Sequence, residues 1–92
     1  MKNDNIVYVG RKNTMAYVMA VMMQMNQGNT EVTIKARGKS ISRACDVSEI
    51  TKNKFMNQIK TDKIKIYTEE IQTENNEPLK ISSIEILMKK IE

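Results

Sequence analysis

The sequence contains no histidine, so it lacks the residue that most often serves as a general base or a metal ligand. Its single cysteine, Cys45, has no histidine to activate it and is expected to fill a small buried position in a helix. Neither a Walker loop nor a G-x-G-x-x-G motif occurs, and the C-terminal carboxylates lack the apolar surroundings that acid–base catalysis requires. We therefore expect a protein that is not an enzyme and that holds no metal and no cofactor.

Long apolar runs are also missing. No run approaches membrane-spanning length, and the polar residues 1–5 lack the apolar segment of a signal peptide. These absences predict a soluble, intracellular chain with no membrane partner. Residues 1–92 are expected to form a single domain that buries only a modest fraction of its surface, so oligomerisation would add stability.

Negative charge is scarce in the first half of the chain. Residues 1–45 contain seven basic side chains against two acidic ones, a net charge of +5. Residues 46–92 contain eight lysines against nine acidic side chains, a net charge of −1. This asymmetry favours a polyanionic partner for the first half, although moderately basic proteins without such a partner are common.

The most informative stretch is residues 32–42, which read V-T-I-K-A-R-G-K-S-I-S. Apolar and polar side chains alternate as far as Gly38, a pattern typical of a half-buried strand with one cationic face. Apolar residues then recur at helical spacing, which predicts a glycine turn leading into a helix N-terminus. That terminus offers unpaired N–H groups, and four cations flank it: Lys35, Arg37, Lys39 and Arg43. The arrangement predicts a phosphate site, with a simple solvated charged face as the alternative.

A similar junction occurs earlier in the chain. Residues 6–9, I-V-Y-V, are a short apolar run that predicts a central strand. Arg11 and Lys12 follow it, and Asn13 is suited to cap a helix that ends at Gly28. The first strand therefore also delivers two cations to a helix N-terminus.

Two features of the predicted helices leave alternatives open. Five of the eight methionines lie in the first helix, where we expect them to fill the core face, with Met19 or Met23 as the exposed exception and a partner groove as the alternative. The second helix is predicted from about Ser40 to at least Phe55. From its type and place alone, Phe55 is expected in the core rather than against a partner.

The C-terminal third predicts a β-hairpin. Residues 63–67 and 84–88 alternate like strands, and residues 68–79 between them carry four glutamates, an Asn-Asn pair and the only proline. The apolar phase changes after residue 81, which indicates a bulge near Ser82 and Ser83. The predicted order is β-α-β-α-β-β: an α+β fold with two helices, a mixed sheet whose first two strands are parallel, and an extended antiparallel C-terminal hairpin.

These elements carry motifs that resemble the Alba family of archaeal chromatin proteins. The motifs are G-R-K at residues 10–12, N-Q-G at 26–28, I-K-A-R-G-K-S-I-S-R-A at 34–44, V-S-E-I at 47–50, N-K-F at 53–55 and S-I-E-I at 83–86. They extend over nearly the whole chain. The resemblance implies a fold like the C-terminal domain of bacterial translation initiation factor three. It also implies a homodimer that binds double-stranded DNA, and often RNA, with little sequence preference.

The resemblance also implies roles for individual residues. In the family, the basic pair after the first strand and the arginine before the glycine contact phosphates, which are Arg11, Lys12 and Arg37 here, with Lys39 beside them. The two hairpin arms of the dimer lie along the minor groove. The phenylalanine at Phe55 takes part in contacts between dimers, which replaces the core position expected from its type. The four hairpin glutamates depart from the family pattern and would repel phosphate, so we expect weaker binding or a different use of the arms.

Three functions remain open on the sequence alone. The leading one is a dimeric DNA-binding protein that packages or organises chromatin, with a cytoplasmic, nucleoid-associated location and higher assemblies along DNA. The second is an RNA-binding protein of ribonucleoprotein particles. The third is a protein-interaction module with weak DNA binding that uses the acidic arms and the methionine-rich helix.

Overall fold

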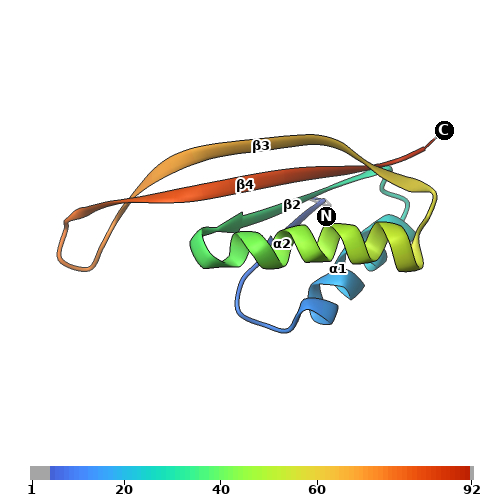
Figure 1. Cartoon of the computed structure of the whole chain (residues 1–92), viewed down its shortest axis with the longest axis horizontal. Coiled ribbons are helices and arrows are strands. Elements are labelled where there is room, and N and C mark those ends of the chain that lie inside the picture. The colour runs from blue at the N-terminus through green and yellow to red at the C-terminus, as the bar shows by residue number, and fades with distance from the viewer. Residues whose placement is uncertain (1–4, 92) are drawn as a thin grey trace.

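The computed structural model describes residues 5–91 and has the predicted order of strands and helices (Figure 1). The elements are β1 (Ile6–Val9), α1 (Thr14–Asn26), β2 (Glu31–Arg37), α2 (Ile41–Ile50), β3 (Ile59–Gln72) and β4 (Pro78–Lys90). A 3₁₀ turn, Gly38–Ser40, precedes α2, and a π turn, Thr51–Phe55, follows it. Helical backbone therefore continues as far as Phe55, as predicted.

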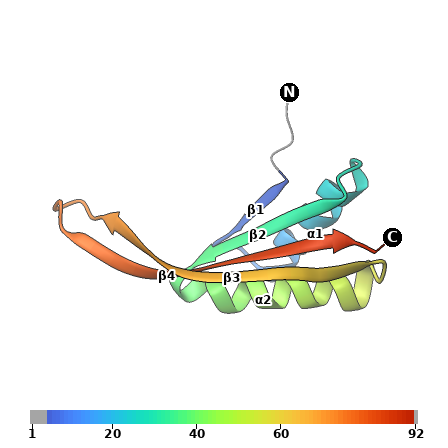
Figure 2. The same cartoon turned by 90° about the horizontal axis from the view of Figure 1, so that it is seen from above.

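The strands form one mixed sheet in the order β1-β2-β4-β3. β1 and β2 are parallel, and both β2–β4 and β3–β4 are antiparallel, as the sequence predicts. Figure 1 shows α1 and α2 on the same face of the sheet, and Figure 2 shows its strands side by side. We call the face covered by the helices the helix side and the other face the open side.

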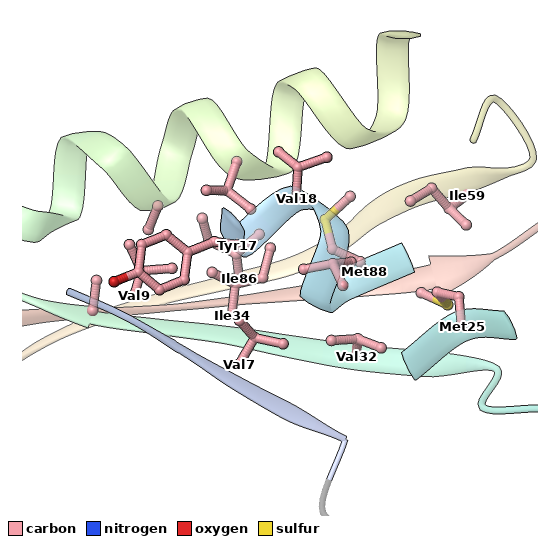
Figure 3. Packing of buried hydrophobic residues seen from close by; sticks show 14 of the residues in the cluster. Val7, Val9, Tyr17, Val18, Met25, Val32, Ile34, Ile59, Ile86 and Met88 are labelled. Atoms are coloured by element: carbon pink, nitrogen blue, oxygen red, sulfur yellow. The ribbon is translucent and has the colours of Figure 1, made fainter. Parts of the chain in front are cut away.

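The core lies between the sheet and the two helices (Figure 3). Buried and half-buried residues alternate along β2, where Val32, Ile34 and Ala36 face the helices. In α2 the buried positions are Ala44, Val47 and Ser48, and Thr51 is buried at the start of the π turn. Cys45 lies about 100° around the helix from Ala44 and is exposed, so the prediction of a buried cysteine is wrong.

Helix α1 begins and ends as predicted, but its core face differs. The Asn13 side chain accepts a hydrogen bond from the Ala16 N–H at 3.0 Å, and Gly28 follows the helix with a left-handed φ of 99°. The buried side chains are Tyr17, Val18, Val21 and Met25. Because valines occupy the centre of the core stripe, Met15, Met19 and Met23 face outward with 43%, 52% and 58% exposure. The prediction of a methionine-filled core face therefore holds for Met25 and, in part, for Met22.

The hairpin reaches past the sheet as predicted, but its strands are longer than predicted and its bulge lies elsewhere. Both strands extend well past residues 63–67 and 84–88, so that β3 and β4 pair with each other alone over residues 68–82, which we call the arm (Figure 1). Ser82 and Ser83 pair regularly with Thr68 and Tyr67, and the irregularity lies between Thr61 and Lys63. The change of apolar phase has a different cause. The arm extends beyond the core, so its apolar side chains need not face the helices.

Candidate nucleic-acid interface

Two loops that each follow a strand lie next to each other at one end of the sheet. They are residues 10–13, between β1 and α1, and residues 37–40, between β2 and α2. The hydroxyl oxygen of Tyr17 accepts hydrogen bonds from the backbone N–H groups of Gly10 (2.9 Å) and Lys12 (3.0 Å). Because the Tyr17 ring is buried in the core, these bonds fix the loop that carries Arg11 and Lys12.

Arg43 joins the two loops. Its guanidinium Nη1 donates a hydrogen bond to the Gly10 carbonyl oxygen at 2.7 Å, and the Ser40 hydroxyl donates to the same oxygen at 3.4 Å. The sequence predicts Arg43 as part of the phosphate site. In the structure its guanidinium group holds the loop after β1 against the start of α2. A charge-assisted bond to a partly buried carbonyl is stronger than a neutral one, so this contact gives the site its shape.

Gly38 fits the second loop against the arm. It has a left-handed φ of 54°, and a Cβ atom there would lie 3.2 Å from Cδ1 of Ile81. Both the backbone conformation and the close approach favour glycine. The turn predicted from the sequence is therefore also the place where the arm meets the body of the domain.

Three cations stand free at these loops. Arg11 and Lys12 in the first loop and Lys39 in the second are exposed, and none of them has an ion pair within residues 5–91. We call these three residues the cationic corner. Unpaired charges on a fixed backbone can meet the phosphates of a nucleic acid without first giving up a carboxylate.

Arg37 is exposed, but its guanidinium group is bonded to a carboxylate of the arm. Its Nε donates to Oε2 of Glu69 at 3.0 Å and its Nη2 to Oε1 at 3.4 Å, while the buried hydroxyl of Ser83 donates to the same carboxylate at 2.5 Å. The hydrogen bonds from Ser83 and Arg37 lower the pKa of Glu69. Glu69 thus occupies the place on Arg37 that a phosphate would take, a role that the sequence does not reveal because the two residues are 32 positions apart.

Lys35 lies on the open side and is also paired. Its Nζ lies 3.8 Å from Oε2 of Glu85, which accepts a hydrogen bond from the Tyr67 hydroxyl at 2.6 Å. This bond lowers the pKa of Glu85 and raises that of Tyr67 to about 12. The Lys65 ammonium lies 5.2 Å from the centroid of the Tyr67 ring. The predicted phosphate residues therefore separate into the free cationic corner and three cations with internal partners.

Several large apolar side chains are exposed outside the core. Phe55 is 48% exposed at the end of the π turn, so its expected core position is wrong, while its role between dimers remains a prediction. Ile64 and Ile66 are 58% and 76% exposed although their partners across β3–β4, Ile86 and Ile84, are buried. They lie on the helix side of the outer strand, where neither helix covers them. The alternation in K-I-K-I-Y predicts the strand, but it does not predict that neither helix covers these two isoleucines.

Within the part of the chain that the structure describes, no helix is long and apolar enough to cross a membrane. The same residues contain no group of three or more acidic, cysteine or histidine side chains arranged to hold a metal ion.

The fold and this site define a class of small basic α+β domain, with a cationic corner beside the root of a long β-arm. The family model described as Alba matches residues 5–68, and the chain belongs to the Alba family. It is 47% identical over 90 residues to the DNA/RNA-binding protein Alba of Methanocella arvoryzae, covering 98% of this chain and 94% of that one. It is 49% identical over 86 residues to the protein of the same name from Methanococcus maripaludis, covering 92% of this chain and 97% of that one.

Solved structures agree with this assignment. Alba from Thermoplasma volcanium superposes with a TM-score of 0.86 at 46% identity, covering 92% of this chain and 99% of that one. ALBA1 from Trypanosoma brucei superposes with a TM-score of 0.78 at 25% identity, covering all of this chain and 74% of that one. The predicted family and α+β fold are therefore confirmed.

Proposed function

We propose that this protein is a non-enzymatic, dimeric nucleic-acid-binding protein that holds the phosphate backbone of double-stranded DNA and helps to package the chromosome. Little sequence preference follows from the chemistry, because contacts to phosphates carry no base information. A cytoplasmic, nucleoid-associated location follows from the same proposal. No cofactor or metal is required for it.

The observation that carries the proposal is the cationic corner. Its three side chains are exposed and free of carboxylates among the described residues. The loops beneath them are held by hydrogen bonds that Tyr17 accepts and that Arg43 donates. Preorganised cations release counterions from DNA without a prior rearrangement of the protein. The names of the relatives, DNA/RNA-binding protein Alba, support the same class of ligand.

The remaining candidate residues take more specific roles in this proposal. Arg43 positions the first loop instead of meeting a phosphate. Arg37 reaches a phosphate by exchanging its bond to Glu69 for one to the nucleic acid, and Lys35 contributes at longer range. Glu69 faces Arg37 at the root of the arm, so it opposes binding at one defined point.

A second copy of the chain is the proposed occupant of the uncovered helix side of β3. Ile64 and Ile66 are exposed there, and Ile66 and Ile41 border a common hollow with Thr68 and Ser82. An outer strand with exposed isoleucines is prone to associate with another chain. A dimer built on this face places two cationic corners and two arms in one particle, which favours binding to both sides of a duplex. Phe55 then lies free for contacts between dimers.

The test of DNA binding is fluorescence anisotropy of a labelled random-sequence duplex over a salt series. If Arg11, Lys12, Lys39 and Arg37 of both subunits each meet a phosphate, the log–log slope is roughly −7 at most. The triple variant R11A/K12A/K39A removes six of about eight contacts, so its slope should fall to roughly −2. An unchanged slope in this variant would overturn the assignment of the corner.

A matched control removes three charges from the opposite end of the sheet. Lys52, Lys60 and Lys89 lie there and are ion-paired with Glu49, Asp62 and Glu31. The variant K52A/K60A/K89A has the same net charge as the corner variant but should keep most of the slope. Equal losses in both variants would mean that net charge, and not the corner, drives binding.

Two competing functions give different results in the same assay. An RNA duplex that displaces the DNA at equal concentration supports the ribonucleoprotein function. Weak binding that the corner variant leaves unchanged supports a protein partner, for which the exposed stripe of Met15, Met19 and Met23 on α1 offers an adaptable surface.

The proposed dimer is tested by light scattering after size-exclusion chromatography. Ile64 and Met23 have the same exposure, 58%, but lie on β3 and α1 respectively. I64E places a charge in the proposed interface and should yield a monomer, whereas M23E should remain a dimer. A dimeric I64E protein would place the interface elsewhere.

A further inference from the structure

The open side of the sheet carries an aromatic feature that phosphate binding does not use. Tyr8 lies between Val7 and Val9, which face the core, so its side chain projects from the open side, where it is 66% exposed. Its register partner on β2 is Lys35. An exposed tyrosine beside a cation on an uncovered strand is a surface on which a flat, negatively charged ligand can lie.

Tyr8 borders a hollow of about 620 Å³ on this side of the sheet. The hollow is lined by residues of all four strands, among them Tyr8, Lys35, Arg37, Tyr67 and Glu69, and by Ser40. A volume of this size accommodates a nucleotide-sized group. Both helices lie on the opposite face of the sheet, so neither of them covers the hollow (Figure 1).

The two tyrosines at the hollow differ in what they can do. The hydroxyl of Tyr67 is bonded to Glu85, and the Lys65 ammonium lies near its ring, so Tyr67 forms a fixed wall. Tyr8 has no such contacts in the described structure and leaves its ring open for stacking. The two carboxylates here already have cationic partners, Glu69 with Arg37 and Glu85 with Lys35, so they do not present free negative charge to a ligand.

We propose that this hollow binds an unpaired base of single-stranded nucleic acid, with the base stacked on Tyr8 and the adjoining phosphate near Lys35. Every base has an aromatic face, so such stacking tolerates any sequence, and an uncovered four-stranded sheet with exposed aromatics is a recurrent way to bind single strands. A paired base inside a duplex cannot reach Tyr8 in this way. The inference rests on the proposed binding of phosphates but adds a site that only unpaired strands use.

The test compares two oligonucleotides with equal numbers of phosphates. One is single-stranded decathymidylate, and the other is a ten-residue strand that carries tetrahydrofuran in place of every base. Stacking of one base should make the first bind roughly 5- to 150-fold more tightly in an anisotropy titration. Equal affinity for the two strands would overturn the base site and leave phosphate binding intact, whereas binding of neither strand nor a duplex would refute the proposed function itself.

Variants at Tyr8 test whether this residue causes the preference for the strand that carries bases. Y8T keeps a β-branched residue in the strand and should abolish the preference for the strand with bases without changing the affinity for the abasic one. Y8F keeps the ring and should keep the preference. The matched control M19A removes a similarly exposed side chain from α1 and should change neither affinity. A preference that survives in Y8T would overturn the assignment to Tyr8.

A direct readout uses the unmodified protein. The chain has three tyrosines and no tryptophan. Tyr17 is buried and Tyr67 is bonded to a carboxylate, so stacking on Tyr8 should quench tyrosine fluorescence as decathymidylate is added. The abasic strand should cause no quenching, and equal quenching by both strands would contradict the stacked geometry. Decauridylate in a parallel titration shows whether the site distinguishes RNA from DNA.

Discussion

The cationic corner and the open side of the sheet both carry arginine and lysine side chains, but the two regions differ in whether these side chains are ion-paired. At the corner, Arg11, Lys12 and Lys39 have no ion pair within the described residues. On the open side, Lys35 and Arg37 lie 3.8 Å and 3.0 Å from carboxylates of β4 and β3. The difference shows that the number of basic residues near a turn overstates the charge that a ligand can use. What decides availability is whether a distant strand supplies a carboxylate.

The largest effect should come from disturbing the contact that holds the corner in shape. R43A removes the charged donor to the Gly10 carbonyl, and we expect it to lower the free energy of unfolding by about 1.5–3 kcal/mol. Urea denaturation followed by circular dichroism measures this loss. R11A removes the same charge from an exposed position and should leave stability nearly unchanged. Equal stability of the two variants would refute a structural role for Arg43.

A smaller effect should come from removing the carboxylate partner of an open-side cation, so that this cation becomes unpaired like those of the corner. E69Q keeps an oxygen that can accept from Ser83 but removes the charge that holds Arg37, so duplex affinity should rise about 1.5- to 5-fold. E74Q makes the same change of charge in the exposed turn of the arm. If both variants gain equally, the acidic arm acts by general repulsion and the contact between Glu69 and Arg37 is not special.

The smallest effect concerns acid stability. Hydrogen bonds from Ser83 and Arg37 lower the native pKa of Glu69, and the bond from Tyr67 lowers that of Glu85. The resulting stabilisation is present above the ordinary value of 4.5 and is lost as the pH falls through the lowered native values. The melting temperature of E69Q/E85Q should therefore lie slightly below that of the unmodified protein at neutral pH and converge with it in acid. A gap that persists in acid would mean that the two charges are not the cause.

The elements of this fold are largely predictable from the chain because their signals are local. The alternation in V-T-I-K-A-R defines β2, Gly38 defines the turn, and Asn13 caps α1 through a bond to an N–H three residues away. Each depends on neighbours in the sequence, whose geometry the backbone dictates. The family resemblance rests on the same local motifs, and the matching family model and relatives confirm it.

The wrong predictions concern side chains whose surroundings come from elsewhere. Cys45 and Met15 are exposed because other residues of their helices face the sheet. The phase change after Ile81 is not a bulge, because the arm has left the core by that point. Hydrophobicity alone cannot tell which side of an element a neighbour will cover.

By itself the sequence determined the order of the elements, the family and the set of basic residues near the two turns, since spacing and composition encode these. Only the tertiary structure decided which of those residues are free. Arg37 meets Glu69 across 32 positions and Arg43 meets Gly10 across 33, and both contacts depend on how the strands are arranged in the sheet. The open side with Tyr8 also exists only because both helices pack on the other face (Figure 1). Such contacts depend on three-dimensional proximity, which a local pattern in one sequence does not specify.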